Sequence, residues 1–155
     1  MSARPVRHRL TPATSAPAVR VFVAMSLREA EEPALIDYWH AMRRAATRAR
    51  GNFDLRRIDH VEGTYEIIDR IFHEIDAADL VIADLTLSPA NVYLELGFAR
   101  GRDKPIIQTC HESTPLEFDV RGYRTLIYPN ATTLEDKLLT HLDALPPTCT
   151  QCQGV

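Results

Sequence analysis

The residues DLVIADLTLSPANVYLELGFARGRDKPII, at positions 79–107, contain the pattern that predicts the fold class most directly. The first eight of these residues are almost all apolar or β-branched, which predicts a buried strand over 79–86. Ser88 and Pro89 predict the cap and the first residue of a helix that continues over 90–101, and 104–110 predicts another buried strand. A strand, a helix and a strand in this order form a βαβ unit, whose two strands lie parallel in one sheet.

The same alternation continues on both sides of this stretch. Further strands are predicted at 19–26, 53–60 and 125–130, and further helices at 33–50, at 66–78 after a Thr64 cap, and at 132–145. Right-handed crossovers between parallel strands place helices on both faces of a sheet. The sequence therefore predicts an α/β protein, a three-layer sandwich around a five-stranded parallel sheet of flavodoxin- or Rossmann-like type.

The chain of 155 residues has the length of one domain, which we expect to span 19–145. We expect 1–18 to be a flexible basic arm without the apolar run of a secretory signal, and 146–155 to be a flexible tail. The net charge of −3 predicts no nucleic-acid partner, and no apolar run is long enough to predict a membrane span.

The chain has three cysteines, Cys110, Cys149 and Cys152, without a disulfide framework, which predicts a reducing, cytoplasmic location. Cys149 and Cys152 form a lone C-x-x-C pair, to which His111 and His141 could add zinc ligands. The other interpretation is a tail with exposed thiols. We favour the tail and expect neither a metal site nor a cofactor.

In open parallel sheets, ligands bind beyond the carboxyl ends of the strands. The loop after the first strand, MSLREAEEP, has neither a dinucleotide-binding glycine pattern nor a phosphate-binding loop. What the predicted strand ends offer is a set of carboxylates, Asp59, Asp84 and Glu95. Carboxylates suit chemistry at an anomeric carbon, because they can attack C1′ or stabilise its positive charge. The sequence therefore favours N-glycosidic chemistry over redox or nucleotide-triphosphate chemistry.

The order VFVAM, ADLT, NVYLELG, KPII and FDVRGYR resembles the nucleoside 2-deoxyribosyltransferase-like superfamily, including its bacterial TIR-like relatives. This resemblance covers roughly residues 19–145. It implies cleavage or transfer of the N-glycosidic bond of a nucleoside, nucleotide or NAD. It also implies a homo-oligomer in which a neighbour completes the site. The alternative is a TIR-like, nucleotide-sensing or self-assembling defence module with no or conditional catalysis.

The resemblance also implies roles for individual residues. Glu95 matches the catalytic glutamate, and Asp84 matches an acidic residue of the pocket that orients ribose or assists the leaving base. The substrate-binding residues are expected to be Phe22, Ala24, Met25, Ser26, Asp59, Asn91, Asp119 and Arg121. The chain departs from the family at Ser26-Leu27, where a proline and an aromatic residue are common, which bears on the choice of base.

Simpler structural roles compete with several of these assignments. Asp84 can close an Asx turn after its strand, and Asn91 can be a structural residue of the first helical turn. Asp59 can be a solvated strand end, and Asp119 and Arg121 can form a local salt bridge that orders the connection over 111–124.

Overall fold

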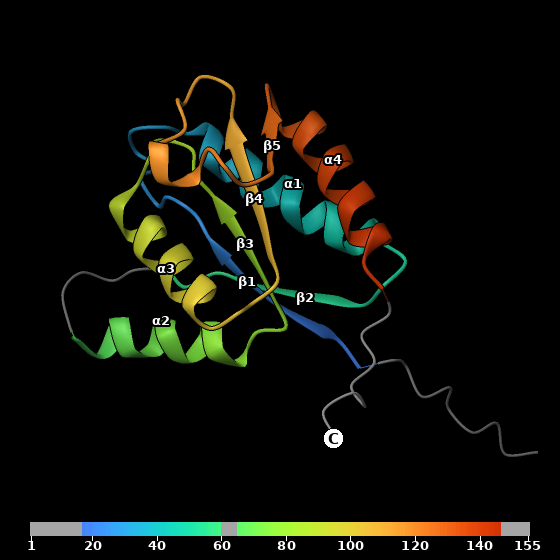
Figure 1. Cartoon of the computed structure of the whole chain (residues 1–155). Helices are drawn as coiled ribbons and strands as arrows, with labels where there is room; N and C mark the ends of the chain where they lie inside the picture. Colours follow the sequence, from blue (N-terminus) through green and yellow to red (C-terminus); the bar gives the residue numbers. More distant parts are fainter. Residues whose placement is uncertain (1–16, 60–64, 147–155) are drawn as a thin grey trace, which may run out of the picture.

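The computed structural model describes residues 17–59 and 65–146 (Figure 1). The predictions for most of the arm and tail, for the cap Thr64, and for a zinc site at Cys149 and Cys152 lie outside the described residues. None of the helices in the described ranges is long and apolar enough to cross a membrane.

The described residues form one five-stranded sheet in the order β2-β1-β3-β4-β5, and all neighbouring strands are parallel. The strands are β1 (Val19–Ala24), β2 (Phe53–Arg56), β3 (Leu80–Asp84), β4 (Ile106–His111) and β5 (Thr125–Tyr128). The predicted α/β sandwich is confirmed. Because β2 and β3 lie on opposite sides of β1, the direction of the chain across the sheet reverses between β1 and β3.

Helices cover both faces of the sheet (Figure 1). The helices are α1 (Ala34–Arg48), α2 (Tyr65–Ala77), α3 (Ala90–Gly101) and α4 (Ala131–Ala144). Helices α1 and α4 pack together on one face and share an apolar core with alternate strand residues such as Val21, Val23 and Ile82. Helices α2 and α3 cover the other face, where the core includes Phe22, Val81 and residues of both helices.

The sheet is covered on both faces, which explains why the sequences of its strands are continuous apolar runs. Successive strand residues point to opposite faces, so a strand between two helical layers needs apolar side chains at every position. All five residues of β3 are buried, and the fifth of them is Asp84. This carboxyl group is therefore an exception that needs polar partners.

Several predicted boundaries were wrong by one to four residues. Strand β1 ends at Ala24 and β2 at Arg56, so Met25, Ser26 and Asp59 lie beyond the strands rather than in them. At α3 the cap is Pro89, with no side-chain cap hydrogen bond, and the predicted cap Ser88 lies one residue earlier. The long connection after β4 contains a short 3-10 helix, Phe118–Val120.

Contacts at the carboxyl end of α3 hold this helix in place. The Arg100 guanidinium lies 3.3 Å from the centre of the Tyr123 ring and donates to Gln108 on β4. Arg102 donates two hydrogen bonds of 2.6 Å to the Asp76 carboxylate at the end of α2. Paired donors of this geometry restrict both partners. The helix that carries Glu95 is thus fixed to both the sheet and α2.

Candidate functional site

A shallow hollow lies where the strand order reverses, at the carboxyl ends of β1 and β3. Its volume is about 470 Å³. It is lined by Ser26, Leu27 and Arg28 after β1, and by Ser88, Pro89, Ala90 and Asn91 at the start of α3. This hollow, which we call the switch-point hollow, lies where open α/β sheets bind their ligands.

Glu95 lies in the second turn of α3, five residues after its first residue. Its side chain is 5% exposed, and it shares the buried face of the helix with Val92, Leu96 and Ala99. Burial raises the pKa of the Glu95 carboxyl from 4.5 to about 7, because the charged form is poorly solvated there. A carboxyl group that changes charge near neutral pH is suited to acid–base or nucleophilic work.

Asp84 ends β3 and is completely buried. One carboxyl oxygen accepts a hydrogen bond of 3.1 Å from the Thr86 backbone N–H. The other accepts from the Thr109 hydroxyl at 2.6 Å and from the Tyr128 hydroxyl at 2.8 Å. Burial raises the pKa of Asp84, and these hydrogen bonds work in the opposite direction. The contact with Thr86 is the Asx turn that was the structural alternative for this residue.

Asp84 and Glu95 approach the sheet from opposite faces. Asp84 and its partner Thr109 are adjacent in register on β3 and β4, and Tyr128 belongs to the core beneath α1 and α4. Glu95 lies on the buried face of α3, which packs on the other side of the sheet. The strand pleat therefore turns Asp84 toward the α1 layer, away from the layer that contains Glu95, and neither carboxyl group lines the switch-point hollow.

Aromatic side chains complete the surroundings of Asp84. Tyr128 packs edge-on against Tyr38 of α1 at 5.0 Å and against His111 at 5.7 Å between ring centres. The His111 backbone N–H donates to the Thr86 hydroxyl at 3.0 Å, which links β4 to the loop after β3. This network joins the carboxyl ends of three strands. It was missed in the sequence because its members are far apart in the chain and have ordinary strand neighbours.

The residues at the end of β1 and directly after it separate between the two layers. Phe22 and Ala24 belong to the core beneath α2 and α3, the layer that contains Glu95. Met25 belongs to the core beneath α1. Ser26 is buried, lines the switch-point hollow and accepts a hydrogen bond of 3.3 Å from the Arg28 N–H. Of these four predicted substrate-binding residues, Ser26 alone lines this hollow. Asn91 lines it from the helix side and is exposed.

Asp59 is exposed and pairs with Arg57 at 3.0 Å. Arg57 also bonds to Glu29 at 3.0 Å, and its guanidinium lies 5.0 Å from the centre of the Trp39 ring. The side chain of Arg57 is only 12% exposed. Arg57 is thus the residue that organises the chain after β2. The sequence analysis named Asp59 in this region and did not name Arg57.

Asp119 and Arg121 lie in or next to the 3-10 helix and are both exposed. The Arg121 guanidinium donates to the Leu116 carbonyl at 2.8 Å, so it braces the connection between β4 and β5. Neither residue lines the switch-point hollow.

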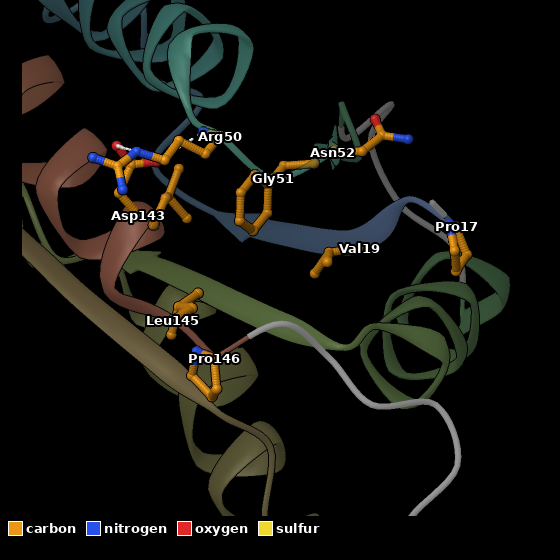
Figure 2. A pocket seen from close by; sticks show the side chains of 10 residues that line it. Pro17, Val19, Arg50, Gly51, Asn52, Asp143, Leu145 and Pro146 are labelled. Atoms are coloured by element: carbon orange, nitrogen blue, oxygen red, sulfur yellow. Dashed lines mark hydrogen bonds and ion pairs between the residues drawn. The ribbon is translucent and has the colours of Figure 1, made fainter. Parts of the chain in front are cut away.

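Another hollow, of about 330 Å³, lies at the opposite end of the strands (Figure 2). It is lined mainly by apolar residues such as Val19, Leu142 and Leu145. Its carboxylate, Asp143, accepts a hydrogen bond of 2.8 Å from the Arg50 backbone N–H. Ligands of open α/β sheets bind at the carboxyl ends of strands, so this hollow at the amino ends is not the candidate site. Within the described ranges, no cluster of three or more His, Cys, Asp or Glu has the arrangement of a metal site.

Comparison with solved structures finds proteins that are similar to this chain. The CMP N-glycosidase BcmB of Clostridium botulinum is similar with a TM-score of 0.57 and 20% identity, over 77% of this chain and 97% of that chain. A 2-desoxiribosyltransferase from Leishmania mexicana is similar with a TM-score of 0.47 and 20% identity, over 61% of this chain and 65% of that chain. No protein-family model matches the chain. No curated protein matches it either.

The similarity to BcmB covers nearly all of that protein, and at this level of identity it shows a common fold. The fold that the sequence resemblance implied is thereby confirmed. In this chain, the helix that follows β3 has a buried glutamate in its second turn. The chain therefore combines this glutamate with the α/β fold that it shares with a CMP N-glycosidase.

Proposed function

We propose that this protein cleaves the N-glycosidic bond of a nucleoside or nucleotide, or transfers its sugar, through Glu95. The observation that carries the proposal is the burial of Glu95 on the inner face of α3, with a pKa raised to about 7. The position of this helix after the strand-order reversal and the fold shared with an N-glycosidase support the same activity.

In the proposed reaction the C1′–N bond breaks and its electron pair leaves with the base. The sugar develops positive charge at C1′, which the Glu95 carboxylate stabilises or captures as a covalent ester. Water then gives the free sugar, whereas a second base gives a new nucleoside. The departing base takes up a proton, from solvent or from an acid in the site.

The burial of Glu95 suits this role. A carboxylate in a region of low effective dielectric interacts more strongly with a nearby positive charge than it would in water. The raised pKa has the same cause, so the group is less stable as an anion until a cationic transition state forms beside it. The Glu95 carboxylate therefore stabilises the transition state more than it stabilises the bound substrate.

The other residues have supporting roles in this proposal. Ser26 and Asn91 line the switch-point hollow and are the candidates for contacts with sugar or phosphate. Asp84 acts as a positioning residue, because its oxygens are engaged by Thr86, Thr109 and Tyr128. The homo-oligomer and the cytoplasmic location stay predictions. Light scattering during size-exclusion chromatography tests the first of them.

The test is incubation of the purified protein with nucleosides, nucleoside monophosphates and NAD, followed by chromatography for the released base. Wild type and Glu95→Gln are compared with Glu112→Gln, which alters an exposed carboxylate after β4. We expect release by the wild type and by Glu112→Gln, and loss of release in Glu95→Gln. Full release by Glu95→Gln would refute the role of Glu95. Saturable nucleotide binding without release would support the nucleotide-sensing alternative.

A further inference from the structure

The turn between β3 and α3 has an unfavourable backbone conformation at two successive residues. Leu87 has a φ of 68° and Ser88 a φ of 46°. Residues with a Cβ rarely adopt positive φ, because the Cβ approaches the carbonyl oxygen, and leucine has no side-chain polar group to compensate. Strain of this kind persists where the surrounding structure imposes it.

The surrounding structure binds both polar backbone groups of Leu87. Its N–H donates to the Thr114 hydroxyl at 3.1 Å, from the connection after β4. Its carbonyl accepts from the Arg28 guanidinium at 3.0 Å, from the loop after β1. The turn is also closed by a hydrogen bond of 3.0 Å from the Ser88 N–H to the Leu85 carbonyl. Three loops at the carboxyl end of the sheet thus meet at Leu87, which we call the Leu87 clamp.

The Leu87 clamp lies directly before the helix that carries Glu95. Pro89 is buried, and its carbonyl accepts the Val92 and Tyr93 N–H groups at 3.0 and 3.2 Å, which starts α3. A helix transmits a shift of its first turn to the next turn, because each residue is bonded to the one four positions earlier. Moving the turn therefore moves the Glu95 carboxyl relative to the carboxyl ends of β1 and β3.

We infer that the Leu87 clamp positions Glu95 for the reaction, with Thr114 and Arg28 as positioning residues. This inference rests on the proposed N-glycosidic activity. Arg28 lines the switch-point hollow and can also touch a ligand, so Thr114, which does not line it, is the better residue for a test. A displacement of about 1 Å at a reacting group costs about 10²-fold in rate.

The first experiment compares Thr114→Val, which removes the hydroxyl at nearly constant shape, with Thr114→Ser, which keeps it. We expect Thr114→Val to lower kcat about 10- to 100-fold with KM within about twofold, and Thr114→Ser to restore most of kcat. A role in stability alone would leave kcat of the folded fraction unchanged. If Thr114→Val has the kcat of the wild type and Glu95→Gln is inactive, the inference about the Leu87 clamp is wrong. The proposed function would still stand in that case.

The second experiment needs no activity and tests the strain itself. Leu87→Gly and Leu87→Ala both remove the leucine side chain, but only glycine accepts positive φ without cost. We expect a higher Tm for Leu87→Gly than for Leu87→Ala, which is the reverse of the usual order of these residues. A Tm for Leu87→Ala equal to or above that of Leu87→Gly would overturn the strained clamp. This comparison stays decisive even if the wild type releases no base.

Discussion

Asp84 and Glu95, the two acids assigned to one pocket by sequence, face opposite sides of the central sheet. Asp84 accepts hydrogen bonds from Thr109 and Tyr128 in the layer of α1 and α4. Glu95 lies on the inner face of α3 in the other layer. In our proposal Asp84 is a positioning residue and Glu95 the catalytic one, so we expect their variants to fail in different ways.

Exchange of Asp84 for asparagine should reduce stability. The amide would place an N–H₂ group among donors from Thr86, Thr109 and Tyr128, in a position that is completely buried. Loss of satisfied buried hydrogen bonds costs about 1–3 kcal/mol for each group left unpaired. We therefore expect urea unfolding of Asp84→Asn to show a lower free energy of unfolding by on the order of 2 kcal/mol. Stability equal to the wild type would contradict the role of this network.

Exchange of Glu95 for glutamine should reduce activity at neutral pH without the loss of stability expected for Asp84→Asn. Glutamine has nearly the same shape but cannot attack or stabilise a positive C1′. We expect a loss of about 10³-fold or more in kcat, measured as base release at saturating substrate, with circular dichroism like that of the wild type. An active variant, or one that is unfolded, would count against the separation of the two roles.

The pH dependence of the rate should report the ionisation of Glu95. If the carboxylate is the reactive form, the rate rises as pH increases through about 7, the pKa to which burial raises this group. About a tenth of the group is ionised one pH unit below its pKa and about nine tenths one unit above. We expect kcat to follow this rising limb between about pH 6 and pH 8. A rate that falls over the same range would show instead that the protonated acid is required.

The same pKa shift has a consequence for stability. The folded state keeps the Glu95 proton to about pH 7, whereas the unfolded chain releases it near 4.5. The favourable contribution of the neutral form is thus complete below about 4.5 and is lost as pH rises through about 7. Glu95→Gln lacks this loss. Its stability relative to the wild type should increase by on the order of 3 kcal/mol between about pH 4.5 and pH 8.

A control for this stability measurement is Glu112→Gln, because Glu112 is exposed at the same end of the sheet. Its stability relative to the wild type over the same pH range shows how much the loss of an exposed carboxylate contributes by itself. A pH-independent difference between Glu95→Gln and the wild type would show that the carboxyl group is not held in its neutral form.

Removal of the Tyr128 hydroxyl should destabilise the carboxyl ends of the strands. Tyr128→Phe takes away the donor at 2.8 Å from Asp84 and the contact at 3.0 Å with the Thr86 hydroxyl. We expect a loss of about 1–3 kcal/mol in chemical denaturation. Tyr123→Phe is the matched control, because Tyr123 is 48% exposed and the Arg100 guanidinium contacts its ring rather than its hydroxyl. Equal effects of the two variants would contradict a special role for Tyr128.

The order and type of the helices and strands could be predicted from the sequence. A continuous apolar run such as that of β3 indicates a strand buried on both faces. Apolar residues spaced three and four apart indicate a helix buried on one face. Both patterns are local in the chain. They were sufficient to predict the parallel sheet, and the position of Glu95 one and a half turns into a helix follows from the same local pattern.

Which polar residues contact one another depends on the tertiary structure and could not be predicted from the sequence. The face toward which Asp84 points depends on its position in the pleat and on partners 25 and 44 residues away in the chain. The three loops that meet at Leu87 also come from separate parts of the chain, and its positive φ occurs where Arg28 and Thr114 bond to its two backbone polar groups. Such contacts depend on strand order and register, which local patterns do not contain.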